Sequence, residues 1–267
     1  MVRPTRRKSM RARLDEGETL VGTLHDFVDP ALIEIVGWVG YDYVVLEHEH
    51  GLRSLESIQN LIRAAEAAGL DTIVRVGTTA PALIQQILEA GATGVMVAHV
   101  RTAEDAETIV RAARYAPRGT RGEGYTRNGR LWEIGPGTTA LHEQADHEAI
   151  VLAIIEDPEG VENIEAIVRT PGLTGIAPGY ADLATGLGGV PLDSPEVLDR
   201  MAHVIKAVNA QPEVRMLSMV QDAASIPGII EEGNQLVLWN HDVILVGNLY
   251  KKLLDDTRAA LGQGDGA

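Results

Sequence analysis

The sequence predicts an α/β protein of the (β/α)8 TIM-barrel type. Short apolar runs alternate with helical patterns along nearly the whole of its 267 residues. Most of these runs are continuously apolar, which is typical of parallel strands buried on both faces. Their number is close to eight within about 250 residues, which is the size of one such barrel.

The expected strands are short runs rich in valine, isoleucine and leucine. In chain order they cover residues 19–24, 43–46, 72–76, 94–98, 150–155, 173–177, 214–219 and 243–246. The run at 236–239 could extend or replace the last of them. In a barrel, all strands run the same way, so we expect reactive side chains on the loops that follow their carboxyl ends.

Helical patterns fill the intervals between these strands. The pattern at 29–40 has Asp29 as its N-cap and Pro30 as its first helical residue. The next, at 54–69, starts with Ser54 and ends at Gly69, a residue type that favours the position just after a helix. The remaining helical patterns cover residues 80–91, 102–116, 160–170, 194–210 and 222–233.

A doubly wound open sheet is the competing architecture. The strand count and the absence of a GxGxxG motif after the first strand both favour the barrel. We therefore expect one domain over residues 1–267, with a basic N-terminal extension at 1–15 and a C-terminal helix and tail at 250–267.

The composition excludes several classes of partner. The formal net charge is −15, so phosphate repulsion argues against a general affinity for nucleic acid. No apolar run approaches the roughly 20 residues that a membrane span requires, and cysteine is absent. We expect a cytoplasmic protein without a membrane partner. The basic residues near the start are expected to form a tail or first helix: Arg3, Arg6, Arg7, Lys8, Arg11 and Arg13.

One long segment, at 116–140, breaks the strand–helix rhythm. It is rich in glycine and carries Arg118, Arg121, Arg127 and Arg130 in an otherwise acidic chain. A loop of this length inside a compact domain is usually functional or mobile. Two interpretations stay open: a solvated loop paired with acidic neighbours, or an anion-binding or subunit-contact loop over the active-site face.

Ionisable residues gather where the expected strands end. The motif "EHEH" follows the second strand and is compatible with a metal site, an acid–base site or a solvated strand end. Because parallel strands end on one face, these side chains should converge on one rim. The candidates are Glu47, His48, Glu49, His50, Arg75, His99, Glu156, Asp157 and Asp182.

Two of these carboxylates suggest a metal site. Glu156 and Asp182 follow neighbouring strands and offer the hard oxygen donors that suit Mg2+ or Mn2+. The alternative is a structural ion pair between Glu156 and Arg75. Arg75 has apolar neighbours and therefore needs a carboxylate or an anionic ligand, because an unpaired buried charge is costly.

These segments resemble the HpcH/HpaI aldolases, which are metal-dependent class II pyruvate aldolases. The resemblance covers about residues 20–255. It rests on "GYDYVVLEHEHG", "TIVRV", "ILEAGATGVMVAHVRTAEDA", "YAPRGTRGEG", "IIEDPEGVENIEAI" and "GLTGIAPGYADLATGLG". It implies a barrel of the phosphoenolpyruvate/pyruvate type and a homo-oligomer, often a hexamer built as a trimer of dimers with exchanged C-terminal helices. The implied reaction is reversible cleavage of 4-hydroxy-2-oxo acids to pyruvate, or a related 2-oxo acid, and an aldehyde.

The resemblance also implies roles for individual residues. His50 matches the catalytic histidine, and Glu47 stands where the family has the aspartate that orients it. Arg75 matches the arginine that contacts the substrate's keto oxygen and stabilises the enolate. Glu156 and Asp182 match the ligands of the divalent metal, which we expect to be Mg2+, Mn2+ or Co2+. Substrate contacts are expected from Arg75 and from two residues before Asp182, namely Gly179 and Ala181.

Departures from the family pattern touch the pocket wall. Glu47 replaces an aspartate, Leu24 an aromatic residue, and His99 and Tyr180 each stand where a proline is common. Two further hypotheses stay open. One is a CoA-thioester lyase of the citrate lyase β or malyl-CoA lyase branch, in which the basic segment 116–130 would serve the CoA phosphates. The other is a non-catalytic barrel that binds a partner.

Overall fold

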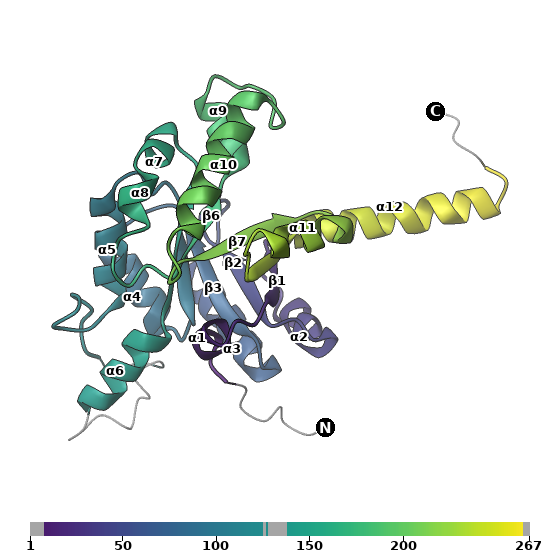
Figure 1. Cartoon of the computed structure of the whole chain (residues 1–267). Coiled ribbons are helices and arrows are strands. Elements are labelled where there is room, and N and C mark those ends of the chain that lie inside the picture. Colours follow the sequence, from purple (N-terminus) through teal and green to yellow (C-terminus); the bar gives the residue numbers. More distant parts are fainter. Residues whose placement is uncertain (1–7, 125–126, 128–137, 264–267) are drawn as a thin grey trace.

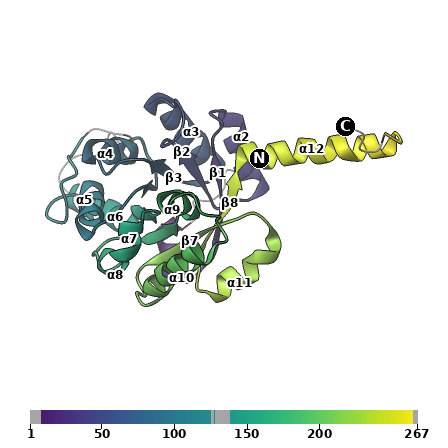
Figure 2. The same ribbon diagram turned by 90° about the horizontal axis from the view of Figure 1, so that it is seen from above.

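The computed structural model describes residues 8–124, 127 and 138–263. Eight parallel strands form a closed barrel in sequence order, and helices surround it (Figures 1 and 2). The predicted fold class is therefore confirmed. The strands are β1 Leu20–His25, β2 Tyr43–Glu47, β3 Asp71–Val76, β4 Gly94–Val97, β5 Ile150–Ile155, β6 Gly175–Pro178, β7 Arg215–Val220 and β8 Leu236–His241.

Capping residues begin and end the helices much as the sequence predicts. Asp29 accepts a hydrogen bond from the Ala31 N–H at the start of α2, and Ser54 accepts one from the Ser57 N–H at the start of α3. Gly69 ends α3 with a left-handed φ of 79°. The helices are α1 Met10–Asp15, α2 Pro30–Val39, α3 Leu55–Ala68, α4 Pro81–Glu89, α5 Ala103–Ala113, α6 Thr138–Glu148, α7 Pro158–Glu162, α8 Ile164–Ile167, α9 Tyr180–Gly186, α10 Pro195–Asn209, η1 Ala223–Ser225, α11 Ile226–Glu231 and α12 Asp242–Ala260.

Alternation along the strands divides the core in two. One set of apolar side chains faces the helices, and the other fills the inside of the barrel. Val45 on β2, Ile73 on β3 and Ile154 on β5 belong to the inner set. Because the side-chain period of a strand is two residues, the next inward positions on these strands fall at Glu47, Arg75 and Glu156. Inside the barrel, these three charged residues thus lie nearer the carboxyl ends of the strands than the layer of aliphatic side chains.

The N-terminal end of the barrel is closed by α1. Met10 and Leu14 are fully buried and join the interior cluster. The basic residues Arg11 and Arg13 of this helix form ion pairs with Asp15, Glu18 and Asp42. Residues 1–7, which include Arg3, Arg6 and Arg7 of the predicted basic extension, lie outside the described residues.

The described part of the arginine-rich segment at 116–140 also lies at the N-terminal end of the barrel. It follows α5, which leads back from the carboxyl end of β4, and Arg114 donates to the Ala149 carbonyl just before β5. Arg121 is buried with its guanidinium 4.7 Å from the centre of the Tyr115 ring, and Arg127 pairs with Glu66. The Arg127 pair agrees with a loop paired to acidic neighbours, whereas Arg121 differs because it is buried against an aromatic ring. The contacts place this part of the segment away from the strand carboxyl ends. Arg130 lies outside the described residues.

The last strand differs from the main prediction. Residues 236–241 form β8, whereas the run at 243–246 lies in the first turns of α12. A short apolar run does not by itself distinguish a strand from a helix. Here β8 occupies the place between β7 and β1, and Val243 and Ile244 are exposed on the helix. Two helices, α6 and α9, lie outside the predicted helical ranges, and the first residues of α6 fall in the predicted loop at 116–140.

The C-terminal helix α12 extends away from the barrel (Figures 1 and 2). It carries exposed large apolar side chains: Val243, Ile244, Leu249, Tyr250, Leu253 and Leu254. Within the described part of the chain, no helix is long and apolar enough to cross a membrane.

Candidate functional site

Neighbouring strands bring Glu47 and Arg75 together at the mouth of the barrel. The two residues are register partners in the β2–β3 pair, and both face inward. Glu47 is almost fully buried, and its Oε2 lies 3.4 Å from Nη1 of Arg75. A buried carboxylate of this kind is tolerated because it has a cationic partner.

Arg75 is shared by three residues of the "EHEH" motif. Its Nε lies 2.6 Å from Oε2 of Glu49, and its Nη2 lies 3.3 Å from Nε2 of His50. Together with the Glu47 contact, these interactions fix the guanidinium plane. The sequence predicted an anionic partner for Arg75, and the structure provides two.

Glu47 holds the motif through its backbone. Its Oε1 accepts hydrogen bonds from the N–H groups of Glu49, at 2.5 Å, and His50, at 2.8 Å. The contacts made by Glu47 in the described structure run to these amides and to Arg75. Glu47 is therefore linked to His50 through the main chain and, by way of Arg75, through side chains, and its orienting role stays a prediction. The His50 side chain itself is 63% exposed.

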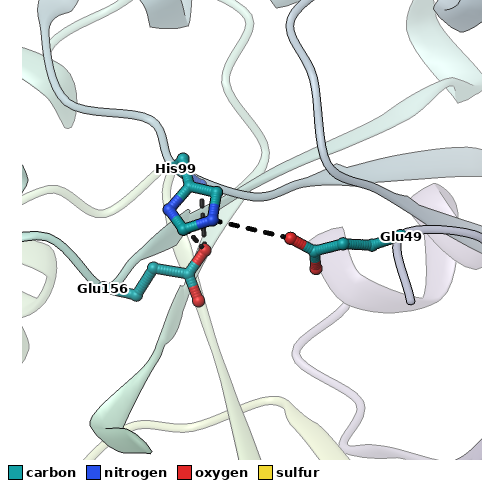
Figure 3. Close-up of side chains that lie close together, drawn as sticks. All are labelled: Glu49, His99 and Glu156. Carbon is teal, nitrogen blue, oxygen red and sulfur yellow. Dashed lines mark hydrogen bonds and ion pairs between the residues drawn. The ribbon is translucent and has the colours of Figure 1, made fainter. Parts of the chain in front are cut away.

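A tight cluster of possible metal ligands lies beside Arg75. Glu49, His99 and Glu156 each offer one ligand atom, and these atoms lie within 4.8 Å of one another. Figure 3 shows the carboxylates of Glu49 and Glu156 directed towards the His99 ring from two sides. Nε2 of His99 is 3.7 Å from Oε1 of Glu49, and Nδ1 is 3.5 Å from Oε1 of Glu156.

His99 is held in place by a chain of charged groups. Its Nδ1 lies 3.0 Å from Oδ2 of Asp157, and Arg101 contacts the same carboxylate at 3.1 Å. A histidine that ligates a metal usually binds a carboxylate through its other ring nitrogen in this manner. The backbone of His99 also has a φ of 56°, in the left-handed region, and its N–H donates to Oε1 of Glu156. Such conformations in residues other than glycine occur most often at functional sites.

The electrostatics of the cluster favour a cation. Burial raises the pKa of Glu156 to about 7, and the charge of Glu49 adds to this effect. The His99 N–H and the charges of His99 and Arg75 act in the opposite direction but do not cancel it. For His99, burial alone would lower the pKa, whereas Asp157, Glu156 and Glu49 raise it overall. Carboxylates crowded in this way would be relieved by a bound divalent metal.

Glu156 and Asp182 also line one larger cavity at the carboxyl ends of the strands. The cavity has a volume of about 400 Å³, and Arg75, Gly179 and Ala181 line it as well. Five of the seven predicted site residues therefore share this space, whereas Glu47 and His50 lie at its edge around Arg75. Asp182 is exposed in the first turn of α9 and does not belong to the Glu49–His99–Glu156 cluster.

Gly179 allows the close approach of β6 to Glu156. A Cβ atom added at Gly179 would lie 2.3 Å from Cβ of Glu156 and 2.8 Å from its Oε2. A larger residue would have to displace that carboxylate. Gly179 therefore sets the position of Glu156 as well as lining the cavity.

Two residues of the cluster were not assigned a role from the sequence. Glu49 was noted as a member of the motif, and His99 as a residue after the fourth strand that stands where a proline is common. The motif could have indicated that Glu49 faces the site, because Glu47 and Glu49 lie two residues apart and such residues share one face of an extended chain. The position of His99 depends on a left-handed backbone conformation, which the sequence did not indicate.

Comparisons with known proteins identify the family of this chain. The sequence profile described as "HpcH/HpaI aldolase/citrate lyase" matches residues 26–248. A hydroxypyruvate/pyruvate aldolase of Roseobacter denitrificans is 28% identical over 94% of this chain and 97% of its own. A 4-hydroxy-2-oxovalerate aldolase of Novosphingobium aromaticivorans is 37% identical over 72% of each chain.

A solved structure extends the comparison to the fold. The crystal structure of citrate synthase SbnG superposes with a TM-score of 0.83 at 32% identity, covering 97% of this chain and 99% of that one. The profile match at residues 26–248 includes the strands that carry the site, β2 to β6. The chain belongs to the HpcH/HpaI aldolase/citrate lyase family and is, as predicted, an enzyme of the carbon–carbon lyase class.

Proposed function

We propose that this protein is a divalent-metal-dependent aldolase. It would reversibly cleave 4-hydroxy-2-oxo acids to pyruvate, or a related 2-oxo acid, and an aldehyde. The observation that carries the proposal is the joint placement of an arginine and a crowded set of carboxylates around one cavity at the strand ends. The names of the related aldolases support the same class of reaction.

The residues present fit a divalent metal. Glu156 is the common member of both candidate ligand sets, with Asp182 across the cavity and with Glu49 and His99 in the cluster. Carboxylate oxygens suit Mg2+, Mn2+ and Co2+, and an imidazole favours the latter two over Mg2+. When bound, the metal would act as a Lewis acid towards the carboxylate and keto oxygens of the 2-oxo acid.

Arg75 is proposed to stabilise negative charge on the keto oxygen. Its guanidinium lines the cavity while Glu47 and Glu49 fix its orientation from the protein side. A preorganised cation of this kind contributes most where charge develops during the reaction. Gly179 and Ala181 line the same cavity and are proposed to contact the bound 2-oxo acid.

His50 is proposed to transfer a proton. Its Nε2 lies 3.3 Å from Arg75, and its exposed ring is accessible to solvent. An imidazole exchanges protons readily near neutral pH. The reaction needs such a group because the enolate of pyruvate must be protonated at C3 after the carbon–carbon bond breaks.

The protruding helix α12 supports a proposal about assembly. A helix that leaves its own barrel with several large apolar residues exposed needs a partner surface. We propose a homo-oligomer in which C-terminal helices pack against neighbouring copies, as in the hexamers implied by the family resemblance. The mass in solution, measured by light scattering, tests this directly.

A second candidate function is formation of a carbon–carbon bond on a 2-oxo acid, as the name of the related citrate synthase suggests. The CoA-dependent variant of this candidate is less favoured. That hypothesis requires the basic segment 116–130 to bind the CoA phosphates, but the Arg121 guanidinium lies over the Tyr115 ring and Arg127 pairs with Glu66. Activity on free 4-hydroxy-2-oxo acids without CoA would separate the two branches.

Three alanine variants test the proposed roles. Glu156→Ala and Asp182→Ala should abolish metal-dependent cleavage while leaving the fold intact, as judged by circular dichroism. His50→Ala should slow turnover by roughly 10²–10⁴-fold, the usual range for a general acid–base group. Normal turnover of either carboxylate variant after chelation would contradict the metal assignment. Equal loss in His48→Ala with none in His50→Ala would move the proton transfer to His48.

A further inference from the structure

A second set of ionisable side chains lies where β8 meets β1. Nδ1 of His241, at the end of β8, is 2.6 Å from Oδ2 of Asp26. Nη2 of Arg53 donates to the other oxygen of Asp26 at 3.0 Å. The three side chains are 25%, 17% and 13% exposed, so the array is largely shielded from solvent.

A β-bulge aims His241 at the cavity. In the β8–β1 ladder, Thr23 pairs with Trp239 but Leu24 pairs with His241, so Asn240 is an extra residue. Leu24 and Leu238 both face the barrel interior. In a regular strand, Asn240 would be the next inward residue, and the extra residue gives that position to His241. Bulges next to active sites commonly redirect a side chain in this way.

The position of Asp26 is fixed from several directions. Asp242 accepts hydrogen bonds from the N–H groups of Asp26, at 2.9 Å, and Phe27, at 3.2 Å. Arg53 also donates from Nε to the Asp26 carbonyl at 2.8 Å. Burial would raise the pKa of Asp242, but the contact with His25 at 3.0 Å and the hydrogen bond from the Asp26 N–H lower it, so this carboxylate stays ionised. A proton-transfer group gains most from a support of this rigidity.

His241 lines the same space as the residues proposed to bind the substrate. It lines the cavity of about 400 Å³ together with Arg75, Glu156 and Asp182. With Nδ1 bound to Asp26, a neutral ring carries its proton on Nδ1 and its lone pair on Nε2. His50, the predicted acid–base residue, is not among the residues that line this cavity.

We propose that His241 is a second acid–base residue of the site, with Asp26 and Arg53 as its positioning residues. This inference rests on the proposed aldolase function. In cleavage, Nε2 of His241 takes the proton of the C4 hydroxyl. The O–H electron pair becomes the carbonyl bond of the aldehyde, and the C3–C4 pair passes into the enolate of the 2-oxo acid. In the reverse direction the imidazolium returns the proton to the new hydroxyl.

The two histidines then serve different halves of the reaction. His241 acts on the hydroxyl of the aldehyde half, and His50 acts on C3 of the 2-oxo acid half. Exchange of the methyl protons of pyruvate with deuterium oxide requires only proton transfer at C3. Cleavage of a 4-hydroxy-2-oxo acid requires proton transfer at C3 and at the C4 hydroxyl, so the two measurements separate the roles of the two histidines.

The test uses His241→Asn in the full-length protein supplied with Mn2+. The asparagine amide can take the place of Nδ1 near Asp26 but has no equivalent of Nε2. We expect kcat for pyruvate release from 4-hydroxy-2-oxovalerate to fall roughly 10²–10⁴-fold, while the rate of pyruvate proton exchange, followed by NMR, stays within about threefold. The control is His203→Asn, an exposed residue on α10 beside Glu165, which should change neither rate.

Asp26→Asn separates positioning from direct catalysis. Removing the carboxylate leaves the ring of His241 without its partner at Nδ1 but keeps the imidazole in the site. The kcat for cleavage should therefore fall about tenfold, less than in His241→Asn, while KM and the rate of pyruvate proton exchange stay within about threefold. A loss as large as that in His241→Asn, or an equal loss of exchange, would contradict a positioning role for Asp26.

Several outcomes would overturn the inference. They are unchanged cleavage in His241→Asn, an equal loss of cleavage and exchange, or a rise in KM with kcat unaltered. If this variant does not fold, as judged by its thermal unfolding, His241→Gln gives the same comparison. Failure of the underlying function looks different, because the wild-type protein with Mn2+ would then show neither exchange nor cleavage.

Discussion

Lowering the pH should weaken metal binding through Glu156. Burial and the charge of Glu49 raise the pKa of this carboxyl to about 7 in the metal-free protein. A group with that pKa is about 90% ionised at pH 8, about half ionised at pH 7 and about 9% ionised at pH 6. Because only the ionised form is a ligand, protons and metal compete for it.

The magnitude follows from these fractions. The apparent Kd for Mn2+ should rise about tenfold between pH 8 and pH 6, which corresponds to about 1.4 kcal/mol. His99 acts in the same direction, because its imidazole must also be neutral to bind a metal and its pKa is raised. At pH 7, binding should release about half a proton from Glu156.

Titration calorimetry with Mn2+ measures both quantities. The Kd is determined at pH 6, 7 and 8, and the released protons are counted by repeating the titration in buffers of different ionisation enthalpy. Glu156→Gln should lose tight binding, whereas Asp199→Asn, an exposed residue of α10, should match the wild type. Equal affinities at pH 6 and pH 8, or an uptake of protons on binding, would refute the reasoning.

Three further variants test parts of the site. Arg75→Met leaves Glu47 and Glu49 without their cation, so the free energy of unfolding should fall by about 3–5 kcal/mol in a urea titration; an unchanged midpoint would contradict the pairing. Gly179→Ala places a Cβ 2.3 Å from that of Glu156, so Mn2+ affinity should fall at least about tenfold. A normal Kd would show that the backbone after β6 moves to make room without displacing Glu156. His99→Ala should weaken Mn2+ and Co2+ binding but leave Mg2+ binding nearly unchanged, because the imidazole favours the first two; equal losses for all three metals would exclude a ligand role.

Much of the fold could be predicted because buried parallel strands have a simple pattern. Seven of the eight strands lie close to their predicted ranges, and Asp29 and Ser54 cap the helices as expected. For the eighth, the sequence left 243–246 and 236–239 as alternatives because the two runs are equally apolar, and the structure has the second. The choice depends on which run pairs with both β1 and β7, and that pairing is fixed only when the barrel closes.

The site was predicted as a set of strand ends, and the structure adds the contacts among them. The convergence of Arg75, Glu156 and Asp182 on one cavity follows from barrel topology and the family resemblance. The contribution of His99 depends on a φ of 56°, and that of His241 on a bulge in β8. Both are local departures from regular backbone geometry, and sequence periodicity does not detect such departures.

The most direct test of the central claim is an assay of pyruvate release from a panel of 4-hydroxy-2-oxo acids. The protein is first treated with EDTA and then supplied with Mg2+, Mn2+ or Co2+. We predict no release after chelation and recovery with added metal, without any requirement for CoA. Full activity in the presence of EDTA, or no release from any substrate with any of the metals, would contradict a metal-dependent aldolase.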